Sequence, residues 1–209
     1  MEHAIHIEGT IGYGSKTIAN IGSTELRLHQ GISNVYCLHG PNGSGKSTLL
    51  KSMAGIQSFI SGGMNWTGRD VLFFNDRLTL PAHATATDLI AACPFPTIGL
   101  DLAQKASLPL KVPISRLSLG NQRKASLAFF FSQLDDSKPR LLLMDEPFNG
   151  LDVDVTPLFW DHLQQVCKHS YTCALVATHI HNDSERFAGT IDFEPAEVSS
   201  TYKVFQRAA

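Results

Sequence analysis

The chain has 209 residues, a net charge of −2, and 43% apolar against 17% charged residues, which is the composition of an ordinary soluble globular protein. This length can bury a sizeable core, and the slightly acidic balance argues against a nucleic-acid partner, whose contact surfaces are normally basic. The four cysteines form no C-x-x-C pair, which favours reduced thiols in a cytosolic protein over disulfides or zinc. No run approaches the ~18 apolar residues of a membrane span, and "MEHAIHIEG" has no signal-peptide pattern, so we expect no membrane crossing.

The first predicted elements are strands followed by a helix. "AIHIEG" and "TELRLH" alternate with period two, which predicts exposed antiparallel strands. "VYCLH", residues 35–39, predicts a short apolar strand that stops at a glycine. "KSTLLKSMAGI" then predicts a helix whose apolar stripe consists of Leu49, Leu50, Met53 and Ile56.

The later elements predict a parallel sheet. "RLLLM" and "CALVAT" are continuous apolar runs, typical of parallel strands that are buried on both faces. Between them, "TPLFWDHLQQVCKH" predicts a helix with Thr156 at its N-cap and Pro157 at its first position. The proline-rich stretch at residues 89–112 predicts short helices inserted into the core. This order of elements predicts an α/β fold in which the sheet is largely parallel.

The strongest local signal is the sequence "GPNGSGKS", which matches G-x-x-x-x-G-K-[ST] between an apolar strand and a helix. Its glycines allow the backbone to wrap a phosphate, and the following helix directs its N–H groups and positive end at that anion. Lys46 is expected to reach the β- and γ-phosphates, and the Ser47 hydroxyl to bind Mg²⁺. The candidate nucleotide-binding residues here are Gly40, Asn42, Gly43, Ser44, Gly45, Lys46, Ser47 and Thr48.

A second signal is "LLLMDEPFNGLD", where an apolar strand ends in two carboxylates. Nucleotides bind at this edge of α/β sheets. Asp145 suits a direct or water-mediated Mg²⁺ contact, and Glu146 suits the residue that polarises the attacking water. An acidic turn after a strand is the alternative, and the neighbouring phosphate loop makes it the weaker one.

The order of five motifs resembles the ATP-binding cassette (ABC) ATPase family over nearly the whole chain. The motifs are the phosphate loop at 40–48, "LSLGN" at 117–121, the acidic strand at 141–146, "NGLD" and "THIH". The resemblance implies a P-loop NTPase core with an N-terminal antiparallel β subdomain and a short helical insertion at about 78–116, all in one domain over 1–209. It also implies the cofactors ATP and Mg²⁺.

The resemblance also implies roles for residues outside the phosphate loop. Ser118 and Gly120 would cap the γ-phosphate of ATP held by a second subunit in a head-to-tail dimer, and Asp152 would lie at the same interface. His179 would contact the γ-phosphate and hold Glu146 and the water, whereas His181 is read as a surface histidine. Tyr13 resembles the family's adenine-stacking aromatic, with a core or turn tyrosine as the alternative.

Two motifs depart from the family pattern. Leu119 and Asn121 replace a glycine and a glutamine of the commonest signature, but Ser118 and Gly120 remain. The loop after "VLFF" has no glutamine, so Asn75, Asp76 or Arg77 takes its place. We expect Asp76 to be the metal contact there and Asn75 to be the second candidate, because the spacing from the strand end in the family points to Asp76 and Mg²⁺ favours hard oxygen ligands.

The function implied is that of the ATP-binding and ATP-hydrolysing subunit of an ABC transporter. Its partners would be a membrane permease and a second cassette, and it would lie on the cytoplasmic face of the cell membrane. The compact length also resembles haem-exporter-like cassettes of cytochrome c maturation. The alternatives are a soluble ABC clamp or switch, as in iron–sulfur assembly, and a phosphate-loop kinase, which the signature loop disfavours.

Overall fold

The computed structural model describes residues 3–29, 31–66, 70–75, 78–134, 140–169, 172–178, 187–195 and 202–208. The chain forms two compact units. Unit 1 comprises Met1–Phe74, Lys138–Glu146 and Gln164–Ala209, and unit 2 comprises Asn75–Ser137 and Pro147–Leu163. The insertion expected at residues 78–116 falls wholly within unit 2. Among the helices in the described ranges, none has the length and hydrophobicity that a membrane span requires.

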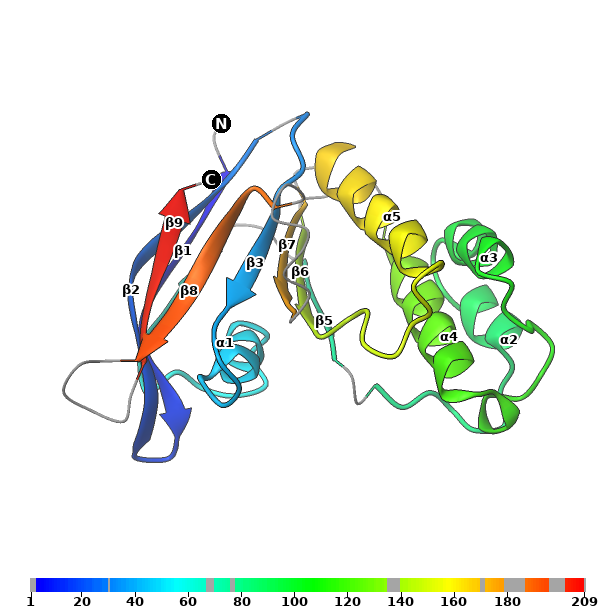
Figure 1. The fold of residues 1–209 in the computed structure, drawn as a ribbon, viewed down its shortest axis with the longest axis horizontal. Coiled ribbons are helices and arrows are strands. Elements are labelled where there is room, and N and C mark those ends of the chain that lie inside the picture. The colour runs from blue at the N-terminus through cyan, green and yellow to red at the C-terminus, as the bar shows by residue number, and fades with distance from the viewer. Residues whose placement is uncertain are drawn as a thin grey trace. The chain divides into compact units, whose positions relative to one another are not determined.

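Unit 1 is built on a mixed sheet whose strand order, in the described part of the chain, is β4-β1-β2-β9-β8-β3-β7-β6-β5 (Figure 1). Its strands are β1 (His3–Tyr13), β2 (Lys16–Leu28), β3 (Val35–His39), β4 (Ser61–Asn65), β5 (Asp70–Phe74), β6 (Arg140–Asp145), β7 (Cys173–Ala177), β8 (Gly189–Pro195) and β9 (Tyr202–Ala208). The half that carries β5, β6, β7, β3 and β8 is parallel throughout. The strand predicted at "VYCLH" is confirmed, and so are the parallel strands predicted at "RLLLM" and "CALVAT".

The N-terminal strands are antiparallel, as predicted. β1 pairs with both β2 and β4 in that sense. The expectation that these strands are exposed is only half right, because alternate residues such as Ile5, Ile7 and Leu26 are almost fully buried. Period two puts one face of each strand into the core and leaves the other to solvent. One face of this antiparallel part therefore contributes to the core of unit 1.

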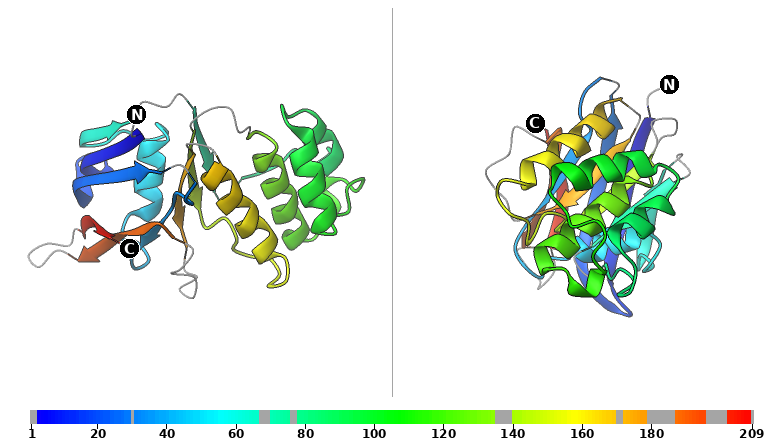
Figure 2. Two further views of the ribbon diagram at one scale, coloured as in Figure 1. Left: turned by 90° about the horizontal axis from the view of Figure 1, so that it is seen from above. Right: turned by 90° about the vertical axis from the view of Figure 1, so that its right-hand side faces the viewer.

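Helix α1 (Lys46–Met53) is buried within this unit. It contacts β1 as well as β6 and β7, and Figures 1 and 2 show it between the two halves of the curved sheet. Leu49, Leu50 and Met53 join the core as expected. The placing of Ile56 on the same stripe is wrong, since the helix ends at Met53 and Ile56 is 62% exposed. The chain instead turns at Gly55, whose φ is +70°.

Unit 2 is helical in its described part. It contains α2 (Ala86–Ala91), α3 (Pro96–Lys105), a 3₁₀ turn at Ile114–Arg116, α4 (Leu119–Phe131) and the first half of α5 (Thr156–His169). The helix predicted over residues 156–169 is confirmed, and so are short helices within the proline-rich stretch. The core of this unit is formed by apolar side chains of α2, α3 and α4 and the loops between them.

Candidate active site

The phosphate loop follows β3 and leads into α1, the context that its motif requires. Gly45 caps α1 with φ +108°, and a Cβ there would come within 2.8 Å of the Ile18 side chain. Only glycine adopts this conformation without strain at so close an approach. The first intrahelical bond is donated by Leu49 N–H to the Gly45 carbonyl at 2.8 Å. The N–H groups of Lys46, Ser47 and Thr48 therefore lie at the open, positive end of the helix.

Lys46 is folded back over its own loop. It is 7% exposed, and its ammonium donates to the carbonyl oxygens of Gly40 at 2.7 Å and Pro41 at 3.0 Å. Burial lowers the pKa of Lys46, while the carboxylates of Glu146 and Asp145 act in the opposite direction. The cation is thus held above the loop, within electrostatic reach of both carboxylates.

Asp145 is the last residue of β6, where it pairs with β7, and Glu146 follows it directly. The Glu146 N–H donates to the Ala177 carbonyl at 2.9 Å, and Glu146 has the left-handed φ of +48°. Such a conformation costs a non-glycine residue about 1–3 kcal/mol and occurs preferentially at functional sites. The acidic pair is therefore placed at the carboxyl edge of the parallel strands, where the phosphate loop also begins.

The buried thiol of Cys37 also feels the charges of this region. Burial raises the pKa of its thiol to about 11, with further increases from Asp192 and Glu146 and a decrease from Lys46. These charged groups come from three segments that are distant in sequence. All three groups therefore lie within electrostatic range of Cys37, the central residue of β3.

The residues present also fit a magnesium ion. Mg²⁺ binds through one or two carboxylates together with hydroxyl, water and phosphate oxygens. Ser47 supplies a hydroxyl from the first turn of α1, and Asp145 supplies a half-buried carboxylate. Within the described residues, no group of three or more His, Cys, Asp or Glu side chains could hold a metal. The donor set thus suits a metal bound with a nucleotide rather than one held by protein alone.

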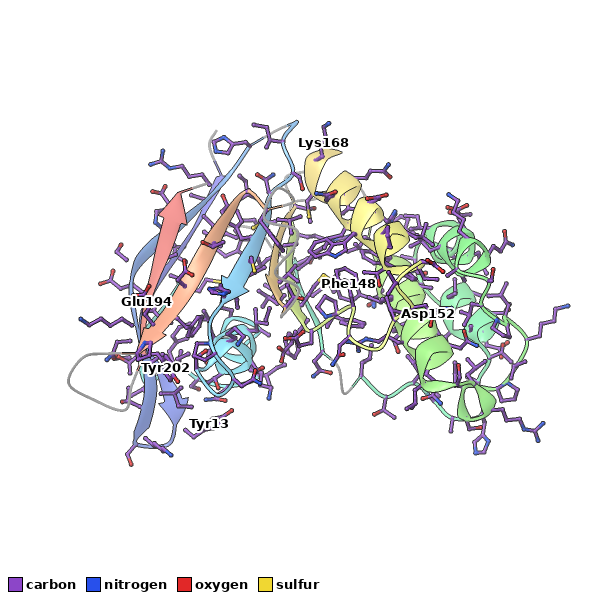
Figure 3. The ribbon with its side chains drawn as sticks, viewed as in Figure 1. Tyr13, Phe148, Asp152, Lys168, Glu194 and Tyr202 are labelled. Atoms are coloured by element: carbon purple, nitrogen blue, oxygen red, sulfur yellow. The ribbon has the colours of Figure 1, made fainter. Side chains whose placement is uncertain are left out.

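Tyr13 lies at the end of β1, at the hairpin with β2 (Figure 3). Its side chain is on the surface, with 54% of the residue exposed, and its hydroxyl is 3.2 Å from the Thr48 hydroxyl. Tyr13 is therefore next to the first turn of α1, and is neither a core residue nor remote from the phosphate loop. Stacking of its ring on adenine stays a prediction.

The signature residues belong to unit 2. Ser118 is the N-cap of α4, and its hydroxyl accepts a hydrogen bond from the Asn121 N–H at 3.3 Å. Gly120 lies in the first turn, where an added Cβ would be 3.5 Å from the Gly150 carbonyl oxygen. Leu119 is 84% exposed between them. The loop thus presents a capped helix N-terminus, which can bind an anion.

Asp152 is fixed to the same helix. Its carboxylate forms an ion pair with the Lys124 ammonium at 3.1 Å, and the aspartate side chain remains 69% exposed (Figure 3). Nearby in unit 2, the Arg123 guanidinium donates to the Asn75 carbonyl at 3.2 Å. Helix α4 therefore contacts three of the predicted functional segments: the signature loop, the loop of Asp152 and the segment that begins at Asn75.

Some predicted residues lie outside the described part of the chain. They are His179, His181, Asp76 and Arg77. The predicted roles of His179 at the γ-phosphate and of Asp76 at the metal therefore stay predictions.

A family model and several sequence relatives match this chain. A model of the family described as "ABC transporter" matches residues 22–89. The thiamine import ATP-binding protein ThiQ of Cereibacter sphaeroides is 30% identical over 171 residues, which cover 71% of this chain and 72% of ThiQ. The chain belongs to the ATP-binding cassette (ABC) ATPase family.

Further relatives agree with this assignment. The lantibiotic transport ATP-binding protein SrtF of Streptococcus pyogenes is 29% identical, with 87% of this chain and 82% of SrtF covered. A solved structure from Pyrococcus furiosus, assigned as an ABC transporter ATP-binding protein, has a TM-score of 0.71 at 20% identity and covers 90% of this chain and 96% of that one. As a member of this family the protein is an ATP-binding ATPase, and it shares the fold of that solved structure.

Two features of this ABC ATPase escaped sequence reasoning. His39, the residue before the phosphate loop, lies 3.0 Å from the carboxylate of Asp192 on β8, and Asp192 also accepts from Thr190 at 3.1 Å. The Asp152–Lys124 ion pair is the second. An acidic residue inside the apolar stretch "TIDF" was the available signal for the first, but its partner is 153 residues away.

Proposed function

We propose that this ABC ATPase closes as a head-to-tail dimer around two ATP molecules and thereby drives a separate membrane permease. The observation that carries the proposal is the convergence of Lys46, Asp145 and Glu146 at the carboxyl ends of β3 and β6. A cation, a metal ligand and a general base at one sheet edge are the groups that phosphoryl transfer to water needs.

Each residue has a distinct part in this proposal. The Lys46 ammonium leaves the carbonyls of its own loop and binds the β- and γ-phosphates, and the N–H groups at the start of α1 bind the same anion. Mg²⁺, held by Ser47 and Asp145, would neutralise charge on the phosphates. The Glu146 carboxylate orients the attacking water and accepts its proton.

The second copy completes the site. Ser118 and the N-terminal end of α4 would cap the γ-phosphate from the partner, because an anion is stabilised at a helix N-terminus. Asp152 is presented beside them on the same unit. His179 of the chain that holds the nucleotide in its phosphate loop would position the attacking water. Opening after hydrolysis then transmits work to the permease.

The transport assignment rests on the names of the relatives, which are ATP-binding proteins for import of thiamine and transport of a lantibiotic. We place the chain on the cytoplasmic face of the cell membrane, bound to integral-membrane subunits. A permease that co-purifies in a fixed ratio from detergent-solubilised membranes supports this. Recovery of the chain with water-soluble partners alone supports the clamp or switch function.

The dimer is tested with Glu146→Gln, which keeps the binding groups but loses the base. With Mg²⁺ and ATP, light scattering after gel filtration should show a dimer that retains two ATP molecules. Ser118→Arg in the same background should remain monomeric while still binding ATP, because its defect lies on the partner's nucleotide. A Glu146→Gln protein that stays monomeric at high concentration with bound ATP contradicts the proposal.

A further inference from the structure

The contact between Tyr13 and Thr48 joins two hydroxyl groups of different environments. Tyr13 is 54% exposed at the end of β1, whereas Thr48 is 4% exposed in the first turn of α1. Their oxygens are 3.2 Å apart, and either one can be the donor. Thr48 follows Ser47 directly, so its hydroxyl lies on the turn whose N–H groups face the proposed phosphate site.

The hairpin end that carries Tyr13 is fixed against the segment after α1. The Gln57 side-chain amide donates to the Gly12 carbonyl, and the Ile60 N–H donates to the Thr10 carbonyl at 2.8 Å. A Cβ on Gly12 would come within 2.8 Å of the Ile60 side chain, so the two segments are in close contact. The position of the Tyr13 hydroxyl relative to α1 is therefore set by several contacts and not by one surface hydrogen bond.

A hydroxyl can donate one hydrogen bond while it accepts another. Phosphate oxygens only accept, so a phosphate beside Thr48 takes the Thr48 proton and leaves its oxygen to accept from Tyr13. Each bond in such a chain polarises the next, which strengthens both. The direction of the Tyr13–Thr48 bond, open without a ligand, becomes fixed when phosphate is bound.

We propose that the Tyr13 hydroxyl is a positioning group in a two-hydroxyl relay, from Tyr13 to Thr48 to a phosphate oxygen of the nucleotide. The inference rests on the proposed phosphate site at Gly40–Thr48. The Tyr13 side chain would then make two separate contributions to nucleotide binding. The hydroxyl acts on the phosphates through Thr48 and is indifferent to the base, whereas the ring can act only on the base.

The test measures binding of two ligands to the full chain in the presence of Mg²⁺: ATP, and inorganic triphosphate, which has no base. Tyr13→Phe should weaken both by about three- to tenfold, the effect of one lost hydrogen bond. Tyr13→Ala should weaken ATP binding further but leave triphosphate binding at the Tyr13→Phe level. Tyr13→Phe added to Thr48→Val should cause no further loss, because the relay is already broken.

Tyr36→Phe is the matched control. It removes another hydroxyl of unit 1, one that donates to the Arg27 carbonyl at 2.8 Å, and it should bind both ligands as the natural protein does. Unchanged triphosphate binding in Tyr13→Phe overturns the relay, and so does an additive loss in the double variant. A natural protein that binds neither ligand refutes the phosphate site itself, which is a separate failure.

Discussion

The ion pair between Lys124 and Asp152 predicts an asymmetry in stability. The Lys124 side chain is 9% exposed and that of Asp152 is 69% exposed. Asp152→Ala leaves a buried ammonium without its partner, which costs about 1–3 kcal/mol in free energy of unfolding. Lys124→Met replaces the cation by an apolar chain of similar length and leaves the aspartate in water, so we expect a cost of about 0–1 kcal/mol.

Urea denaturation measures the difference. In a Trp66→Phe background, Trp160 is the sole tryptophan, and it is buried in unit 2 against the Phe148 ring at 4.6 Å between ring centres. With an m value of about 2 kcal/mol/M, a loss of about 2 kcal/mol lowers the midpoint by about 1 M urea.

The double variant Asp152→Ala with Lys124→Met should return to the level of Lys124→Met. Asp101→Ala is the control, since its pair with Lys105 has both side chains 58% exposed and should contribute less than about 0.5 kcal/mol. The reasoning is refuted if Lys124→Met destabilises the protein as much as Asp152→Ala does.

Three further variants test separate parts of the molecule. Lys46→Ala should abolish ATP hydrolysis and weaken ATP binding at least about tenfold in equilibrium titrations; unchanged turnover would remove Lys46 from the site. Gly99→Ala should lower the free energy of unfolding by about 1–3 kcal/mol, because its Cβ would lie 1.8 Å from the Ser132 hydroxyl; equal urea midpoints would show that α3 can shift. Hydrogen bonds from the Thr85 hydroxyl and N–H lower the pKa of Asp88. The stabilisation that the Asp88 carboxylate gives should therefore be present above the usual aspartate pKa and be lost as pH falls through the lowered pKa of the folded protein. Urea midpoints of Asp88→Ala and the natural protein should therefore converge in acid, and a constant gap would contradict this.

The sequence predicts the parallel half of the fold well because its signals are local. Five-residue apolar runs such as "CALVA" have few arrangements besides a buried strand. The phosphate loop is equally local, since its chemistry depends on consecutive backbone groups. Ile56 shows the limit of this approach. Its spacing fits the helical stripe, but the left-handed turn at Gly55 ends the helix first.

Contacts between distant residues could not be predicted in the same way. The His39–Asp192 pair depends on β3 and β8 being neighbours in register. The acidic residue in "TIDF" singles out Asp192, but the sequence does not indicate which strand lies beside it. Lys124 is similar, because a lysine on a helix is normally a solvated residue and only the fold buries it against Asp152. The partner of a side chain depends on the tertiary structure, whereas a motif such as the phosphate loop depends on consecutive residues and can be recognised in the sequence.

The central claim is that each ATP site is made from two copies of the chain, and mixing two inactive variants tests it most directly. Lys46→Ala loses its own phosphate loop, and Ser118→Arg loses the cap that it gives to its partner. In a mixed dimer one site combines the intact Lys46 with the intact Ser118, and the other carries both defects. Each mixed dimer has one intact site of two, so for an equal mixture we predict between about a quarter of the natural ATPase rate, if all pairings are equally frequent, and about a half, if only mixed dimers form. A mixture no more active than the two variants assayed separately would contradict the shared site.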